Sequence, residues 1–385
     1  MIHDSHLIKV EEYFIDFNKK RKRDIFYIIK AMSRETKRGK SNRMKIIDER
    51  YEIRLAGKKD IPDIMSFIEN YWKSGHIIAR NREFFEYEFL ECDETVNFVL
   101  AIERRVKSIE GLIGFIYASS NPEKLDLWGS MWKVKAGNTG LLGIEILLHM
   151  EKITKCRYNL GIGANPMTTI PIIEKLLHRK VGKMKHYYRL SNMQPNQFKI
   201  ARIEYLPKIC SSIKGKEIQV VVLKSIEELK ACFDIDKYHL SIPYKDYVYI
   251  EKRYYKHPIY HYFVWGIQKK GCVRAIVVCR EQKMKERRVL RIVDYLGDRQ
   301  LMAETERFWR NRLSESLYEY IDFYCYGFEE EFLRDAGFSM VMNDDKNIIP
   351  NYFYPFLQKN IDIWVHSPVE EAVFCKADGD QDRPN

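Results

Sequence analysis

A glycine-rich turn between a predicted strand and a predicted helix is the first feature of this sequence that could carry chemistry. The stretch WKVKAGNTGLLGIEILLHM spans residues 132–150 and has glycines at positions 137, 140 and 143. Glycine lets the backbone approach a ligand closely, and the first amides of a helix point toward anions. The pattern predicts either a phosphate-binding turn or a tight structural corner. It is not a P-loop, because no Gly-Lys-Ser/Thr follows, and the G-x-G-x-x-G dinucleotide spacing is absent.

The strand before this turn carries candidate side chains for proton transfer. In an extended strand alternate residues share one face, which here presents Asp126, Trp128, Ser130, Trp132 and Val134. A carboxylate flanked by tryptophans can have a raised pKa, which suits a base that works near neutrality. The alternative is that Asp126 is solvated near the open end of the strand. Asp126 and Ser130 are therefore catalytic candidates.

The elements that would position these residues alternate between strands and helices. The order over residues 51–190 is β-α-α-β-β-β-turn-α-β-α-β, and a similar order restarts near residue 218. The expected strands of the first half are 51–56, 96–103, 109–119, 125–134, 158–165 and 184–190. The expected helices are 60–72, 82–90, 143–150 and 168–179. Ser225 and Glu228 form a capping box for a helix in the second half. The recurring order indicates a diverged internal duplication.

Composition indicates a globular chain of two domains. The 385 residues are 45% hydrophobic and 13% aromatic. No apolar run is long enough for a membrane span and the N-terminus is not a signal peptide, so we expect the cytoplasm. The eight cysteines form no C-x-x-C pair, so no metal site is expected. The formal charge is +11, and the first 50 residues hold 14 Lys and Arg against 8 Asp and Glu. Such a basic segment either contacts a polyanion or is simply solvated.

The element order with the glycine turn after the fourth strand resembles the GNAT superfamily of N-acetyltransferases. The resemblance covers about residues 51–190 at the level of motifs, and about 217–345 as a degenerate second copy. It implies a mixed α/β fold with two tandem GNAT-like domains. The expected organisation is a basic extension (1–50), an acyl-CoA-binding domain (51–200), a degenerate domain (201–350) and a C-terminal tail (351–385) that packs back onto the body.

The resemblance implies acetyl-CoA as the cofactor and no metal. The pantetheine arm would bond to the strand backbone at Trp132 and Val134, and Asn165 would hold the pantetheine amide. The pyrophosphate would lie on the turn and the first helical residues, namely Asn138, Thr139, Gly140, Leu141, Leu142, Gly143 and Ile144.

The sequence departs from the family pattern in two ways. A glycine stands where the family usually has Arg or Gln, and the tyrosine that many members use as general acid would fall near Ile173. Tyr187 and Tyr188 on the sixth strand are other candidates for protonating the thiolate, although core packing explains them equally well. In the second half the corresponding turn, GDRQLM, contains Asp298, which would repel a pyrophosphate. We therefore predict that the second copy does not bind CoA. The aromatic stretch at 246–265 is either an acceptor pocket or a core.

Three functions agree with these features. The first is an acyl-CoA-dependent N-acyltransferase that acts on a small amine, with a nucleotide-linked amino sugar of bacterial surface-polysaccharide biosynthesis as the favoured acceptor. The second is a FemABX-like aminoacyltransferase that uses aminoacyl-tRNA, with the basic N-terminal segment on tRNA phosphates. The third is a non-catalytic partner protein that retains the fold. The oligomeric state does not follow from the sequence.

Overall fold

The computed structural model describes residues 47, 49–137, 140–208, 218–315 and 318–384. The predicted extension at 1–50 therefore lies almost wholly outside the described residues. The chain divides into two compact units, and the division falls between residues 181 and 182 rather than at the expected position near 200. Residues 117–128 belong to the second unit and residues 366–369 to the first, so the division also passes through strands β4 and β16.

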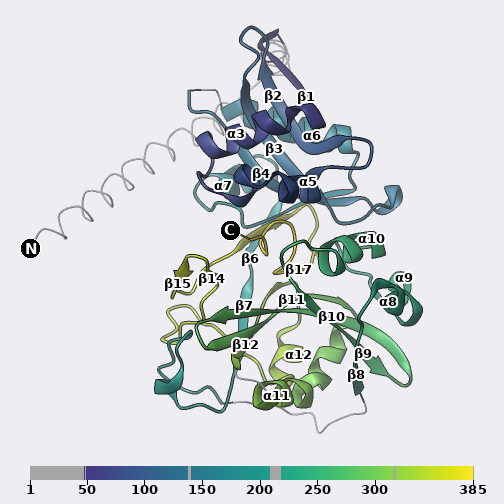
Figure 1. Ribbon diagram of the computed structural model, residues 1–385, viewed down its shortest axis with the longest axis vertical. Helices are drawn as coiled ribbons and strands as arrows, with labels where there is room; N and C mark the ends of the chain where they lie inside the picture. Colours follow the sequence, from purple (N-terminus) through teal and green to yellow (C-terminus); the bar gives the residue numbers. More distant parts are fainter. Residues whose placement is uncertain (1–46, 48, 138–139, 209–217, 316–317, 385) are drawn as a thin grey trace, which may run out of the picture. The chain divides into compact units, whose positions relative to one another are not determined.

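A seven-stranded mixed sheet forms the frame of the first unit (Figure 1). Its strands in spatial order are β1 (Tyr51–Gly57), β2 (Thr95–Glu103), β3 (Ile109–Tyr117), β4 (Asp126–Val134), β5 (Tyr158–Ile162), β16 (Trp364–Ser367) and β6 (Lys180–Lys183). The first three strands are antiparallel neighbours, as the charged turn between β2 and β3 predicted. The sequence did not reveal that β16, from the tail, would stand between β5 and β6.

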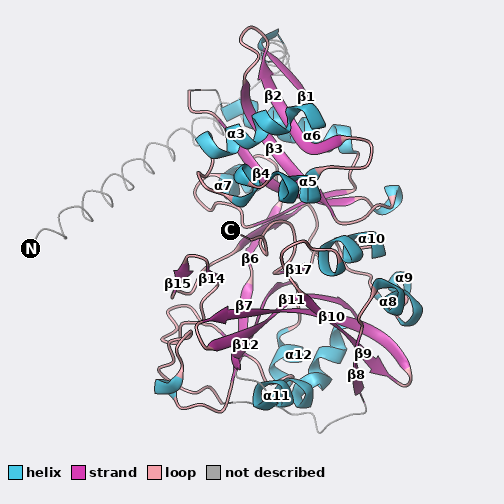
Figure 2. Cartoon of the chain, viewed as in Figure 1, coloured by secondary structure: helices cyan, strands magenta, loops and turns pink. Residues whose placement is uncertain are grey.

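Helices cover this sheet (Figure 2). They are α3 (Ile61–Tyr71), α4 (Ile77–Arg80), α5 (Arg82–Phe89), α6 (Gly140–Thr154) and α7 (Thr169–Lys175). The helical spacing of Ile64, Phe67, Ile68 and Tyr71 predicts the buried face of α3. The first three are buried against the sheet, whereas Tyr71 is 46% exposed. Asp60, which precedes α3, makes no capping bond within the helix. Its carboxylate instead accepts hydrogen bonds from Arg54 and from the Gly57 amide.

An eight-stranded sheet forms the frame of the second unit. Its spatial order is β13 (Ser339–Met340), β7 (Lys185–Leu190), β12 (Tyr318–Tyr326), β11 (Arg287–Gly297), β10 (Cys272–Met284), β9 (Tyr262–Lys269) and β8 (Ile218–Val222), with β17 (Phe374–Cys375) paired to β12. A small separate hairpin joins β14 (Tyr352–Phe353) to β15 (Phe356–Leu357). Only Met184 separates β6 from β7, yet the two strands belong to different sheets. The strand expected at 184–190 therefore forms, but not in the sheet of the first domain.

The helices of the second unit are short. They are α8 (Ile226–Cys232), α9 (Ile235–Tyr238), α10 (Tyr247–Ile250), α11 (Glu306–Glu315) and α12 (Glu330–Asp335). Ser225 caps α8 by accepting a hydrogen bond from the amide of Glu228, as predicted. Buried residues of α11 and α12, such as Trp309 and Leu333, pack on one face of the sheet, and residues near 198–203 and 349–353 pack on the other. The predicted mixed α/β class is confirmed. Within the described residues, no helix is long and apolar enough to cross a bilayer.

Candidate active site

The glycine turn links the end of β4 to the start of α6. Gly137 has φ +91°, a left-handed conformation that disfavours a side chain, and a Cβ there would meet no atom within 4 Å. Helix α6 begins at Gly140, three residues after Gly137. Asn138 and Thr139, two predicted phosphate ligands, lie outside the described residues. The strand, turn and helix expected from the sequence are therefore present, while the middle of the turn is not described.

The first turn of α6 packs tightly on β4. A Cβ on Gly143 would lie 3.3 Å from Trp132 Nε1 and 3.4 Å from Val134 Cγ2, so the missing side chain makes room for these two residues. The indole Nε1 of Trp132 also donates a hydrogen bond to the carbonyl oxygen of Gly143 at 3.1 Å. Packing is thus the direct reason for glycine at 143. The contacts of Gly143 thus support packing against Trp132 and Val134, and no contact supports the expectation that its missing Cβ makes room for a phosphate.

The side chains of the predicted cofactor residues hold the helix rather than face solvent. Leu142 and Ile144 are buried, and Leu141 is partly buried. Gly111 on β3 also contributes, because a Cβ there would lie 2.8 Å from Ile146 of α6 and 3.1 Å from Val134. Because the side chains of Leu142 and Ile144 are directed inward, we expect a ligand at this turn to meet backbone amides, since the first amides of a helix have no acceptor within it. The positive end of a 15-residue helix dipole lies at the same place.

The alternation predicted for β4 is confirmed. Trp132 and Val134 contact α6, whereas Met131, one position away in the strand, lies in the core formed with α3, α4 and α5. The backbone of β4 therefore runs between two covering layers. Ser130, a predicted catalytic residue on the Trp132 face, is partly exposed.

Asp126 lies at the start of β4 and is fully buried. Its Oδ2 accepts a hydrogen bond of 2.8 Å from the backbone amide of Tyr244. The neighbouring Trp128 is also buried and packs on Tyr249 with ring centroids 5.4 Å apart. The suggestion of a solvated Asp126 is wrong, since the carboxylate is enclosed and holds the segment that precedes α10. This contact gives the residue a structural function that the sequence did not indicate.

Asn165 stabilises the turn that precedes helix α7. Its Oδ1 accepts hydrogen bonds from the amides of Met167 at 2.8 Å and Thr168 at 3.2 Å. The residue is exposed, and its Nδ2 donates to no acceptor among the described residues. Asn165 can therefore offer its side-chain Nδ2 to the predicted pantetheine amide, while its Oδ1 is already hydrogen-bonded.

Tyr187, the third predicted catalytic residue, lies in the hydrophobic core of the second unit. It is 2% exposed, and its hydroxyl has no hydrogen-bond partner in the part of the chain that is described. Burial raises the pKa of Tyr187. A phenol enclosed by apolar side chains is poorly placed to protonate a departing thiolate, so core packing explains this residue better than acid catalysis. His186, expected at the surface, is buried as well, with Nε2 3.1 Å from Asp322 Oδ2.

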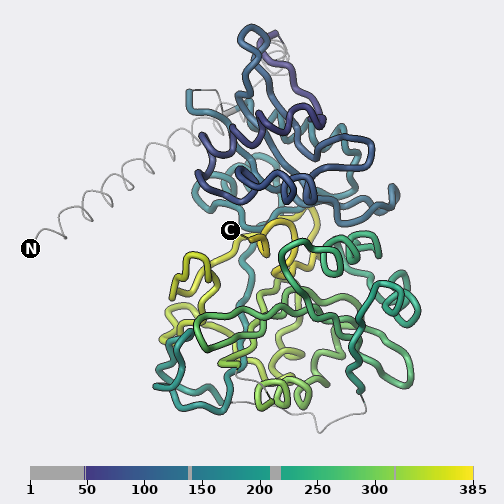
Figure 3. Tube along the Cα trace, in the orientation of Figure 1, coloured from purple at the N-terminus to yellow at the C-terminus, as the bar shows by residue number. Residues whose placement is uncertain are grey.

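In the second unit, a segment of the tail occupies the space between β11 and β12. These two strands pair in parallel from Arg288 with Tyr318 to Ile292 with Phe323. Beyond that point β17 pairs with β12, Cys375 opposite Cys325. The amide of Ala377 donates to the carbonyl oxygen of Val293 on β11 at 2.7 Å. The strap, residues 374–377, therefore bonds to both strands where they separate, and Figure 3 shows the yellow tail among the green strands.

Buried ion pairs anchor the strap and the residues after it. Lys245 Nζ lies 2.7 Å from Asp294 of β11 and 2.6 Å from Asp378. Arg280 forms a two-pronged pair with Asp382, at 3.1 and 2.6 Å. Burial raises the pKa of Asp378 to about 6, against the opposing charge of Lys245. Burial would also raise the pKa of Asp294, but Lys245 and the Tyr254 hydroxyl hold it below its usual value.

The aromatic stretch at 246–265 contributes to this buried network. Tyr254 donates to Asp294 and is buried, and Tyr262, which is partly buried, donates to Asp382 at 2.9 Å. These contacts favour the core interpretation of that stretch over an acceptor pocket. A signal for the network existed in the sequence, namely the acidic tail KADGDQD, but nothing indicated which basic residues would meet it.

Comparison with known proteins gives similarity of fold. No protein-family profile matches the chain, and no curated protein matches its sequence. A conserved protein of unknown function from Enterococcus faecalis V583, described as a probable N-acyltransferase, has 9% identity and a TM-score of 0.50, over 82% of this chain and 71% of the other. A GCN5-related N-acetyltransferase from Anabaena variabilis ATCC 29413 has 8% identity and a TM-score of 0.49, over 82% and 72%. The chain thus shares its fold with an E. faecalis protein whose description is N-acyl transfer.

Proposed function

We propose that the chain is an acyl-CoA-dependent N-acyltransferase that acts on a small amine. The observation that carries the proposal is the junction of β4, the Gly137 turn and α6, where Leu142, Gly143 and Ile144 pack inward in the first turn of a 15-residue helix. The first amides of a helix and its positive end favour an anion. The pyrophosphate of an acyl-CoA is such an anion. The similarity of fold to the E. faecalis protein described as a probable N-acyltransferase supports this proposal.

The reaction needs few groups from the protein. The neutral amine attacks the thioester carbonyl carbon, the C–N bond forms, the C–S bond breaks, and the thiolate takes up the proton that the amine loses. Backbone amides of β4 would stabilise the oxyanion. Of the predicted catalytic side chains, Ser130 is partly exposed and stays the main candidate, because Asp126 and Tyr187 are buried. We further propose a nucleotide-linked amino sugar as the acceptor, and the cytoplasm as the location.

Binding of acetyl-CoA tests the proposal directly. We expect acetyl-CoA to raise the melting temperature of the protein, because a ligand that binds the folded state stabilises it. Gly140→Asp should weaken binding tenfold or more by placing a carboxylate where the pyrophosphate lies. An acid in the first turn does not itself destabilise a helix, so the melting temperature without ligand should hold. Leu148→Glu, on an exposed position of the same helix, is the matched control.

Three outcomes would contradict the proposal. Retention of tRNA at low salt and its release at high salt, without any effect of acetyl-CoA, would favour the aminoacyl-tRNA-dependent reaction. No effect of either ligand would favour a non-catalytic partner protein. Equal binding by the Gly140→Asp variant and the natural protein would remove the turn from the site.

A further inference from the structure

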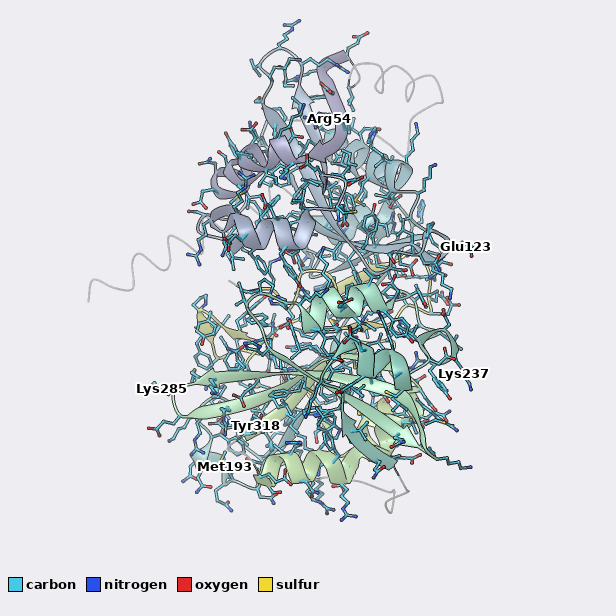
Figure 4. The ribbon with its side chains drawn as sticks, turned by 45° about the vertical axis from the view of Figure 1, so that its right-hand side comes forward. Arg54, Glu123, Met193, Lys237, Lys285 and Tyr318 are labelled. Atoms are coloured by element: carbon cyan, nitrogen blue, oxygen red, sulfur yellow. The ribbon has the colours of Figure 1, made fainter. Side chains whose placement is uncertain are left out.

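A pocket of about 520 Å³ lies in the second unit, remote in the topology from the strap. Its walls come from the end of β7 and the residues that follow, the starts of β11 and β12, and one side of α11. Figure 4 labels two of the lining residues, Met193 and Tyr318, which lie near one another beside this helix. The volume falls within the range of about 300–1,000 Å³ that is usual for small-molecule sites.

Strand pairing explains why these residues meet. β7 runs antiparallel to β12, with Leu190 opposite Tyr320, while β11 runs parallel to β12, with Arg288 opposite Tyr318. The carboxyl end of β7 therefore lies at the same edge of the sheet as the amino ends of β11 and β12. The strap occupies the carboxyl ends of β11 and β12, at the opposite edge. The pocket is consequently separate from the cleft that the strap fills.

Three arginines and one glutamate line the pocket, which makes it positively charged. Arg189 is buried and fully engaged, with Ala336 O at 2.6 Å and Glu306 Oε1 at 2.7 Å. One oxygen of Glu306 is therefore hydrogen-bonded to Arg189, and its other oxygen lies 3.6 Å from Arg310. The remaining two guanidinium groups, Arg287 and Arg310, carry the excess positive charge.

Neither Arg287 nor Arg310 has an oxygen acceptor within hydrogen-bonding distance among the described residues. The Nη1 of Arg287 lies 3.7 Å from the sulfur of Met193, and its Nε lies 3.9 Å from Glu319. The carboxylate of Glu319 is buried and already accepts three backbone amides, from residues 199–201. Arg287 is about one-third exposed and Arg310 about three-fifths, so both can reach a ligand.

The lining also offers a hydroxyl and an apolar wall. The Oγ of Ser191 is buried and has no hydrogen-bond partner in the described part of the chain. A buried polar atom without a partner costs free energy unless a ligand or water satisfies it. Leu190, Met193 and Leu313 supply apolar surface beside these polar groups. The site therefore combines donors for an oxyanion with a surface for an organic group.

We propose that this pocket binds a small organic phosphate. Guanidinium groups match the oxygens of phosphate in a two-pronged geometry, and two arginines whose N–H groups donate to no oxygen among the described residues suit a dianion or trianion. Arg287 and Arg310 each have a carboxylate at 3.9 and 3.6 Å, beyond hydrogen-bonding distance, so their N–H groups can still donate to a phosphate. The Ser191 hydroxyl supplies a further donor, and the apolar wall receives the organic part of the ligand. The inference does not depend on the acyltransferase proposal, because the pocket lies in the eight-stranded sheet, whereas the proposed acyl-CoA site lies in the seven-stranded sheet.

Calorimetric titration of the full chain with pyrophosphate and with ADP tests this site, with citrate as a carboxylate comparator. We expect ADP and pyrophosphate to bind and citrate to bind at least tenfold more weakly. Arg287→Gln and Arg310→Gln should each weaken ADP binding tenfold or more, because each removes charge-assisted hydrogen bonds. Lys285→Gln, in the exposed turn before β11, and Arg307→Gln, exposed on α11, are the matched controls and should bind as the natural protein does.

Several outcomes would overturn the proposal. ADP affinity that is equal in all four variants would place the phosphate elsewhere, and equal affinity for citrate would remove the preference for phosphate. Loss of RNA retention in the two pocket variants, with no binding of ADP, would assign the surface to a nucleic acid. The affinity for acetyl-CoA should be unchanged in Arg287→Gln and Arg310→Gln. This measurement distinguishes a failure here from a failure of the acyltransferase proposal.

Discussion

Gly161 on β5 packs directly against His366 on β16. A Cβ on Gly161 would overlap the imidazole ring of His366. We expect Gly161→Ala to destabilise the protein by about 1–3 kcal/mol, as overpacked cores usually do. The double variant Gly161→Ala/His366→Ala should lose much less than the two single changes together, because the clash is gone. Chemical denaturation measures all three, and strict additivity would contradict the contact.

Protonation of His366 gives a pH-dependent stability. The residue is buried, and burial, reinforced by the charge of Arg179, lowers its pKa to about 3. An unfolded histidine titrates near 6.5, so the unfolded chain binds a proton that the folded chain does not as the pH falls below that value. The stabilisation is complete above about pH 6.5 and is lost toward pH 3, at about 1.4 kcal/mol per pH unit.

The measurement is the slope of unfolding free energy against pH. His366→Gln should lower the slope between pH 6 and 4 by the amount that one bound proton contributes, about 1.4 kcal/mol per pH unit. Arg157→Gln, which leaves the buried histidine in place, should keep the slope. An unchanged slope in His366→Gln would show that the imidazole is accessible to protons in the folded protein.

At the scale of elements, the strap is the feature with the clearest energetic prediction. Lys245→Met removes the cation that lies between Asp294 and Asp378 and leaves two buried carboxylates without the charge that compensates them. Such a loss typically costs about 3–5 kcal/mol. The triple variant Lys245→Met/Asp294→Asn/Asp378→Asn should recover part of that stability, because the uncompensated charges are removed. Hydrogen exchange at the Ala377 amide reports whether the strap is released.

Elements were also the scale at which sequence reasoning worked best. Alternation in β4, the helical period of α3 and the Ser225 cap of α8 all depend on neighbours in sequence, and they agree with the structure. The second half of the predicted capping box does not form, because Glu228 accepts from the amide of Lys224 instead of Ser225. The sequence could not place β16 and β17, because short strands of two to four residues have no period to read and their partners lie far away in the chain. The same holds for Asp126, whose partner Tyr244 is 118 residues away. Long-range hydrogen bonds leave no local pattern.

At the scale of the whole molecule, we predict that one acetyl-CoA binds per chain. The first unit has the β4–turn–α6 junction, while in the second the strap bonds to both β11 and β12 and Asp298 caps the following turn. Calorimetry should therefore give a stoichiometry of one. Hydrogen exchange with acetyl-CoA should slow at β4 and the start of α6 and stay constant at β11. Protection of β11 in place of α6 would reverse the assignment of the two units.

The strands contributed by residues 364–375 bear on how the protein is made. They complete two sheets whose other members precede them in the chain, so both sheets must wait for them during synthesis on the ribosome. Until then one edge of β5 and the end of β12 beyond Phe323 lack their strand partners. Unpaired strand edges are sites where a nascent chain can associate with another. We expect release of these late residues from the exit tunnel to be the event that commits the chain to its final fold.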